Sequence, residues 1–319
     1  MYHLHSPRGW DRRSRVMSDS VEVLRKDAAF VPEVRSPTVR RRELGALLRA
    51  LRLESGFTVE QAADRLLFSM SKLSRMETGH GVATPRDIRD LCELYGVTDE
   101  AERDRMLKLA LEGKQQGWWQ SYDLGFGDYV GLEAAATGLQ YFQSSVVPGL
   151  LQTADYARAV HEAVIPRLAP DRIDELVEVR MMRQRRLTQE PPLTVSVVID
   201  EAAIHRVVGG AAVMRAQLDR LIKMARMPNV TMQVIPFAAG AHPALDCAFR
   251  ILEFTDVVPE VVYVEALSGG FFVERPDQIS TYNKTFDHLR IIALNPQESI
   301  ELVGRISTSY KEDEISRPQ

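Results

Sequence analysis

Several features that mark particular protein classes are missing from this sequence. Only two of its 319 residues are cysteine, Cys92 and Cys247, and they stand far apart, so we expect free thiols in a reducing compartment rather than a disulfide. No run of 18 apolar residues occurs, which argues against a membrane-spanning helix. The basic N-terminus lacks the apolar core of a secretory signal. We therefore expect a cytoplasmic protein with no membrane contact.

The motifs of common enzyme and cofactor sites are also missing. The sequence contains no P-loop, no G-x-S-x-G and no G-x-G-x-x-G. The candidate catalytic or metal-binding groups are Asp200, Glu201, His205, His242, Asp246, Cys247 and Glu265. A proline at 243 disfavours a helical pairing of His242 with Asp246, and His205 and His242 have no third ligand at metal-site spacing. We predict that the chain is not an enzyme and holds no metal or other cofactor.

Charge is distributed unevenly along the chain. Residues 1–89 carry 17 lysines and arginines against 11 aspartates and glutamates, whereas residues 90–319 carry 23 against 33. A basic head on an acidic body is typical of a DNA-binding module joined to a module that does not bind DNA. Chance variation between domains is the alternative explanation.

Residues 58–79 have the pattern of two short helices joined by a tight turn. Thr58 and Gln61 have the spacing of a capping box, Ser69 can cap the second helix, and Gly79 can end it. The side chains left on the outer face of the second helix are those of Met70, Ser71, Lys72 and Arg75. Basic and small polar side chains on a short helix suit the major groove of DNA.

Three further helices are expected around this pair. Leucines at 44, 47, 48 and 51 form the apolar stripe of a helix near residues 39–55. A further helix is expected between Thr84 and Gly96, because Thr84 can cap it, Pro85 suits its first position and Gly96 can end it. Another helix is expected near residues 99–114. The five helices would make a complete small bundle around one core.

The pattern GFTVEQAADRL…S-K-LSRMETG resembles the lambda-repressor-like, or xenobiotic-response-element, family of helix-turn-helix transcriptional regulators. The resemblance covers residues 40–112. The family usually has a glutamine after the capping threonine, where it contacts a backbone phosphate; Val59 stands there in this chain, so that contact must come from elsewhere. The resemblance also implies that Arg52 and Glu77 form a partly buried ion pair that locks the first helix to the third.

The family's motif also implies which side chains meet DNA. Met70, Ser71 and Arg75 would face the bases, and Arg75 is the best candidate for a bidentate contact to guanine, worth about 1–3 kcal/mol of discrimination. Lys72, Thr78 and the backbone at His80 and Gly81 are expected near phosphates. The run Arg40, Arg41 and Arg42 near the start of the first helix would add positive charge near a phosphate strand. Because one such helix binds weakly, we expect a homodimer on an inverted repeat of double-stranded DNA, with the second domain supplying the dimer contact.

Beyond residue 112 the pattern changes from helical to mixed. Helices are expected at 131–141 and 171–188, and strands at 229–237, 248–254, 261–267 and 269–275, the last two as a hairpin. Trp118 and Trp119 either stack on a ligand or base or anchor a linker. We predict a multidomain fold, an all-α five-helix head followed by an α+β domain with a mixed or antiparallel sheet. The predicted segments are a disordered tail at 1–36 (with Met17 as an alternative start), a helix-turn-helix domain at 37–112, a linker at 113–130, the α+β domain at 131–310 and a tail at 311–319.

The second domain resembles the uncharacterised domain that follows such helix-turn-helices in actinobacterial, antitoxin-like regulators. The resemblance is carried by VVPGLLQTADYARAV, VEVRMMRQRRLT and DEAAIHRVVGG, among other segments of residues 117–310. It implies a regulator tuned by a small acidic partner protein. Two alternatives remain: an antitoxin-like protein whose main role is to dock that partner, and a regulator with a small-molecule pocket. Arg180, Arg183 and Arg186 would form either a solvated face or a receiver for the acidic partner.

Overall fold

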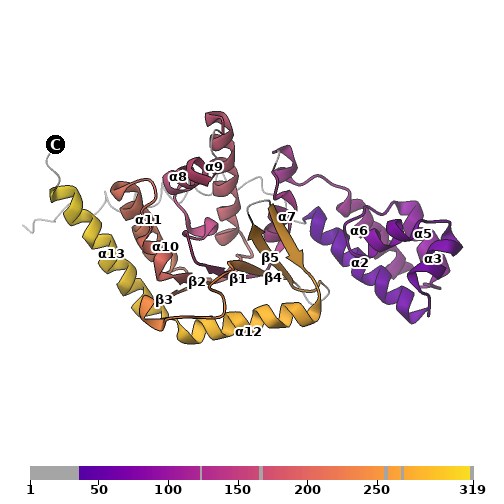
Figure 1. Ribbon diagram of the computed structural model, residues 1–319. Helices are drawn as coiled ribbons and strands as arrows, with labels where there is room; N and C mark the ends of the chain where they lie inside the picture. Colours follow the sequence, from indigo (N-terminus) through magenta and orange to yellow (C-terminus); the bar gives the residue numbers. More distant parts are fainter. Residues whose placement is uncertain (1–35, 123, 165–167, 255–257, 267–268, 317–319) are drawn as a thin grey trace, which may run out of the picture. The chain divides into compact units, whose positions relative to one another are not determined.

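The computed structural model describes residues 36–122, 124–164, 168–254, 258–266 and 269–316. Apart from Ser36, the predicted N-terminal tail and its alternative start at Met17 lie outside the described residues. The first part of the described chain is helical (Figure 1). Its helices are α2 (Pro37–Glu54), α3 (Val59–Leu66), α4 (Met70–Glu77), α5 (Pro85–Leu94) and α6 (Glu100–Gly113).

Local signals set the ends of these helices as the sequence predicts. The Thr58 hydroxyl oxygen accepts a hydrogen bond from the backbone N–H of Gln61, and the side-chain oxygen of Gln61 accepts one from the backbone N–H of Thr58. Ser69 caps α4 by accepting from the Lys72 amide. Gly79 follows α4 with φ of +73°, a left-handed conformation that glycine adopts without a steric penalty.

The core of the head brings α2 against α4. Leu48, Leu73 and Ile88 are fully buried in one apolar cluster. The two helices approach so closely at Gly45 that a Cβ atom there would lie 2.5 Å from the Met76 carbonyl oxygen. A larger residue at this position would push the C-terminal end of α4 away from α2. Gly45 therefore fixes the distance between the first and third helices of the head.

An aromatic anchor occupies the segment that leaves the head. A short 3-10 helix, η2 (Trp118–Ser121), precedes α7 (Gly127–Ala135). Only 3% of Trp119 is exposed, and its ring packs so closely on Gly117 and Gly131 that neither position has room for a Cβ atom. Of the two alternatives for the tryptophan pair, anchoring is confirmed for Trp119. The start of α7 at Gly127 lies inside the predicted linker.

A six-stranded mixed sheet forms the centre of the second domain, which confirms the predicted fold class. Its order is β3 (Val230–Ile235), β2 (Thr194–Asp200), β1 (Gly138–Gln143), β4 (Phe249–Glu253), β5 (Val261–Ala266) and β6 (Gly269–Val273). β1, β2 and β3 run parallel, and the other pairs are antiparallel. The predicted β5–β6 pairing is confirmed. The predicted helix at 131–141 is wrong beyond Ala135, because Leu139, Tyr141 and Phe142 are buried as part of a central strand.

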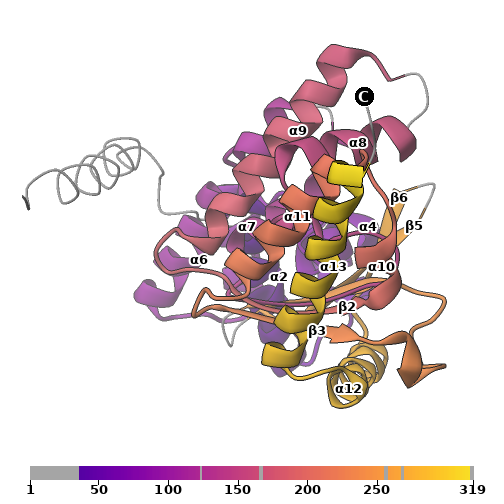
Figure 2. The same cartoon turned by 90° about the vertical axis from the view of Figure 1, so that its left-hand side faces the viewer.

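Helices cover both faces of this sheet (Figures 1 and 2). They are α8 (Ala154–Val164), α9 (Pro170–Gln184), α10 (Glu201–His205), α11 (Ala211–Met224), α12 (Pro276–Ile292) and α13 (Pro296–Ser316), with short 3-10 helices η3 (Gly149–Leu151), η4 (Arg185–Leu187) and η5 (Phe237–Ala239). α12 packs Phe286 and Leu289 on one face, and α8, α9 and α11 lie on the other. α13 continues through 311–316, which the sequence prediction places in the tail. The described helices include none long and apolar enough to cross a lipid bilayer.

A buried polar network joins α7 and α9 to the sheet. The Arg183 guanidinium donates to both oxygens of Glu133, at 2.6 and 2.8 Å, and Tyr129 donates to the same carboxylate. Burial alone would raise the pKa of Glu133, but Arg183 holds it below its ordinary value. Arg250 donates to Tyr141 and to Glu265. The expectation of a solvated arginine face on α9 is therefore wrong for Arg183, which is an internal tie between two helices.

Candidate nucleic-acid interface

Helix α4 presents its polar face to solvent. Leu73 and Met76 point into the core of the head, whereas Met70 is 52% exposed and Ser71 and Arg75 are exposed. The division follows from the sequence, because the two apolar residues three positions apart lie on one side of the helix. The three side chains predicted to contact bases thus share one accessible face.

A buried ion pair fixes the direction of that face. Arg52 of α2 donates from Nε to Glu77 Oε1 at 2.6 Å and from Nη2 to Glu77 Oε2 at 2.9 Å. A third hydrogen bond runs from Arg52 Nη1 to the Phe57 carbonyl oxygen. Both partners of the pair are less than 10% exposed. The predicted ion pair is confirmed, and its bidentate geometry restrains α4 against α2 in both position and rotation.

Arg75 is the free cation of α4. Among the residues that the structure describes, none forms a hydrogen bond or ion pair with its guanidinium. Its backbone carbonyl accepts from the Gly81 amide at 2.7 Å, which holds the turn after the helix close to its last residues. The guanidinium is therefore available to an external acceptor without losing an internal one.

Lys72 is held on the side of α4 that faces α5. Its ammonium group lies 2.6 Å from Asp87 Oδ1 and 3.8 Å from the centre of the Phe68 ring. Burial would raise the pKa of Asp87, but the hydrogen bonds from Lys72 and Thr84 lower it. A phosphate contact from Lys72, which stays a prediction, would have to compete with this carboxylate.

The arginines at the start of α2 already have partners. Arg40 pairs with Glu43 and Glu112 at 2.7 and 3.1 Å, and Arg41 donates to the Gly113 carbonyl oxygen and to Thr38. All three arginines of the run 40–42 are half-buried. These contacts tie α2 to the end of α6. For the phosphate role that the sequence predicts, Arg40 and Arg41 would have to divide their hydrogen bonds between a phosphate and these present acceptors.

Glu274, directly after β6, holds two other predicted phosphate ligands. Its Oε1 atom lies 2.6 Å from Arg42 Nη2 and 3.8 Å from His80 Nε2. Thr78, close by, donates its hydroxyl hydrogen to the Ser74 carbonyl oxygen. A carboxylate of the second domain is thus the partner of Arg42, whose phosphate contact stays a prediction. The sequence gives no hint of this contact, because its partners are 232 residues apart.

Four of the candidate catalytic groups form two pairs where β2 ends and α10 begins. His242 lies 3.4 Å from Asp200, which also caps α10, and His205 lies 3.2 Å from Glu201. Glu265 belongs to the network around Arg250. No group of three or more His, Cys, Asp or Glu residues suited to a metal occurs in the part of the chain that the structure describes. Cys92 and Cys247 are free thiols, as the sequence predicts.

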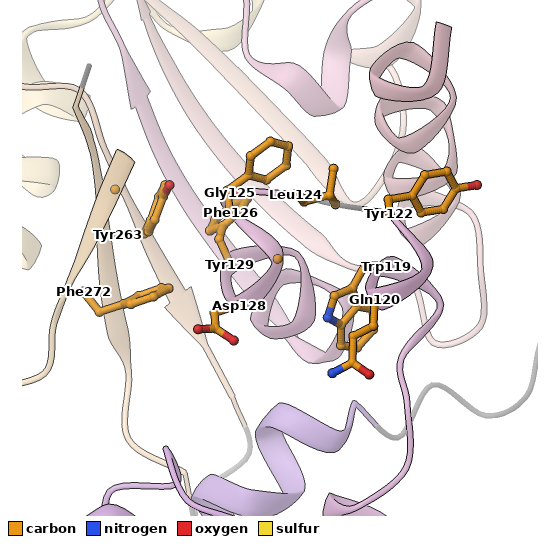
Figure 3. A pocket seen from close by; sticks show the side chains of 12 residues that line it. Trp119, Gln120, Tyr122, Leu124, Gly125, Phe126, Asp128, Tyr129, Tyr263 and Phe272 are labelled. Carbon is orange, nitrogen blue, oxygen red and sulfur yellow. The ribbon is translucent and has the colours of Figure 1, made fainter. Parts of the chain in front are cut away.

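A second feature, which we call the aromatic pocket, lies between η2, α7 and the β5–β6 hairpin (Figure 3). Its volume is about 380 Å³. Its lining residues are Trp119, Gln120, Tyr122, Leu124, Gly125, Phe126, Gly127, Asp128, Tyr129, Tyr263, Gly270 and Phe272. Sequence reasoning identified only Trp119 among them, as one of an aromatic pair. The density of aromatic residues between 118 and 129 is the signal that could have indicated a pocket.

Comparison with known protein families divides the chain at the same place as the fold. The model of a domain of unknown function, DUF5753, matches residues 126–305, and a model described as a helix-turn-helix domain matches residues 43–106. No curated protein and no solved structure matches the chain. The matched helix-turn-helix segment contains α3, α4 and α5 together with Arg52 and Glu77.

Replacing Glu77 with glutamine tests whether the buried pair holds the head together. The substitution leaves the Arg52 charge buried without its counter-charge, which costs about 3–5 kcal/mol for a fully buried pair. We expect a loss of that size in the free energy of unfolding, measured by urea denaturation followed through the helical circular dichroism signal. The matched control, Glu93→Gln on the exposed side of α5, should change stability by less than about 0.5 kcal/mol. Equal, small effects would contradict a locking role.

Proposed function

The chain belongs to the DUF5753 family and carries a helix-turn-helix domain ahead of the family's own domain, and from this premise we propose that it is a sequence-specific transcriptional regulator. It binds double-stranded DNA with α4 in the major groove. The observation that carries the proposal is the exposed Arg75, which has no partner among the described residues, on a helix whose direction is fixed by the Arg52–Glu77 pair. The proposal assigns no catalysis to the chain.

Reading of bases depends on α4 alone in this proposal. Arg75 donates two hydrogen bonds to N7 and O6 of a guanine, and Met70 packs on a thymine methyl group. Ser71 is compatible with several bases and adds little discrimination. Thr78 and His80 lie beyond the C-terminal end of the same helix and contact phosphate. Because Val59 replaces a usual phosphate ligand, affinity depends more strongly on the arginines of α2, which must share their present acceptors.

We further propose that two copies bind together. One short helix contacts too few bases for the affinity that a regulator needs, and a two-fold dimer places two copies of α4 on half-sites about 34 Å apart. The second domain supplies the dimer contact, because the head has no heptad pattern for a coiled coil. The binding site is accordingly an inverted repeat.

The second domain also tunes DNA binding in this proposal. Glu274 competes with phosphate for Arg42, so any ligand or partner that moves the β6–α12 junction changes the availability of this arginine to DNA. A small acidic partner protein and a small molecule are the two candidate effectors. The xenobiotic-response-element subtype and the antitoxin-like role belong to this proposal as well, on the strength of the sequence resemblance.

Selection of binding sites from a random DNA pool tests the base-reading role of Arg75. Wild-type protein should select an inverted repeat with a guanine at one position of each half-site. Arg75→Ala should relax the preference at that position by about 1–3 kcal/mol and leave the rest of the motif intact. The control Arg86→Ala removes an exposed arginine of α5. It should leave the selected motif unchanged, and any loss of affinity should be equal for all sequences. An unchanged motif with Arg75→Ala would contradict the placement of α4, and an unrepeated half-site would contradict the dimer.

A charge-removing substitution in the second domain tests the competition with phosphate. Glu274→Gln should remove the ion pair with Arg42 and tighten binding to the selected site about fivefold, or about 1 kcal/mol, at low salt. Fluorescence anisotropy with labelled DNA measures the effect. The control Asp277→Asn removes a neighbouring negative charge that is paired with Arg275, and a smaller effect is expected there. Equal effects of both variants would show that only net charge matters.

A further inference from the structure

Leu67 has a backbone conformation that leucine rarely adopts. It ends α3 with φ of +55° and ψ of +34°, in the left-handed region, and its N–H group is bonded to the carbonyl oxygens of Ala63 and Asp64. Among the residues that the structure describes, every other residue with a positive φ is a glycine. The left-handed conformation brings the Cβ atom of an L-residue too close to a carbonyl oxygen, so glycine or asparagine would be more stable here. The turn therefore does not account for a leucine.

The core of the head does not account for this leucine either. The side chain of Leu67 is 94% exposed. Its two neighbours, Leu66 and Phe68, pack on the apolar cluster of the head, whereas Leu67 is not part of that cluster. A leucine that costs free energy in the turn and gains none from packing is expected to serve a contact outside the chain.

Leu67 lies near the end of α4 at which the base-reading face begins. Ser69 caps α4 and Met70 is its first residue, so the Cα atoms of Leu67 and Met70 are at most about 11 Å apart. Met70 is also more than half exposed, which leaves two large apolar side chains exposed near the N-terminal end of this helix. Residues 65–76 include lysine and arginine but no aspartate or glutamate. The charge of this segment therefore favours the approach of an anionic duplex.

We propose that Leu67 is a DNA contact, whose isobutyl group packs on an apolar group of the duplex beside the bases that Met70 and Ser71 meet. That apolar group is either the C5 methyl of a thymine or a deoxyribose. The inference rests on the proposed function, because it takes the N-terminal end of α4 to point toward the bases. It goes beyond that function by adding a contact from a residue that precedes α4. A duplex is favoured over a protein partner because the residues proposed to meet bases stand at the same end of the helix.

Two measurements on Leu67→Asn test the proposal. Asparagine tolerates the left-handed conformation, so the variant should unfold at a higher urea concentration than the wild-type protein. Fluorescence anisotropy should nevertheless show binding to the selected DNA site weakened about fivefold, because the variant loses the partial burial of one leucine side chain. The control Leu53→Asn changes an exposed leucine of α2, and it should leave DNA affinity within about twofold of wild type.

Either of two results on Leu67→Asn would overturn the proposal. A lower urea midpoint would mean that the leucine serves the fold, and a DNA affinity equal to that of wild type would assign Leu67 to a protein contact. Binding of the wild-type protein to the same DNA separates this inference from the proposed function. Its absence would contradict both, whereas wild-type binding that Leu67→Asn leaves unchanged would contradict the inference alone.

Deoxyuridine in place of each thymine in turn identifies the DNA group, because this base lacks only the C5 methyl. If one replacement weakens the wild-type protein about fivefold and leaves Leu67→Asn unaffected, the two losses are coupled and the contact is a thymine methyl. If every replacement affects both proteins equally while Leu67→Asn still binds more weakly, the contact is a deoxyribose. Both results support the proposal.

Discussion

The bidentate contact between Arg52 and Glu77 is the constraint on which the DNA-reading geometry depends. A guanidinium and a carboxylate that meet through two parallel hydrogen bonds allow little rotation, so the pair sets the orientation of α4 as well as its distance from α2. Gly45 completes the constraint by allowing the helices to touch. Both partners are buried, so neither can exchange its bond for one with water, and the outer face of α4 is held in one direction.

The second domain contributes rigidity and a source of control. Its sheet is tied to α7 and α9 through Glu133 and Arg183, and α7 carries Gly131, whose carbonyl accepts from Ser36 at the start of α2. β6 leads to Glu274, whose carboxylate pairs with Arg42 of α2.

How much could be predicted from sequence depended on the separation of the interacting residues. The caps at Thr58, Ser69 and Gly79 act over three or four residues and were predicted, as was the Arg52–Glu77 pair through its position in a known motif. Contacts over long separations were not predictable. Arg183 looked solvated because its partner Glu133 is 50 residues away, and the apolar run of β1 has no periodicity that separates a buried strand from a helix. The pocket joins residues 119–129 to 263–272 only after folding.

Methylation interference on the selected DNA site would test the central claim most directly, because it reports which groove the protein needs. Methylation of guanine N7 blocks the major groove, whereas methylation of adenine N3 blocks the minor groove. With Arg75 aimed outward from α4, one N7-methylated guanine in each half-site should exclude the protein from DNA, and methylated adenines should not. Interference confined to adenine N3, or absent from every guanine, would contradict the account.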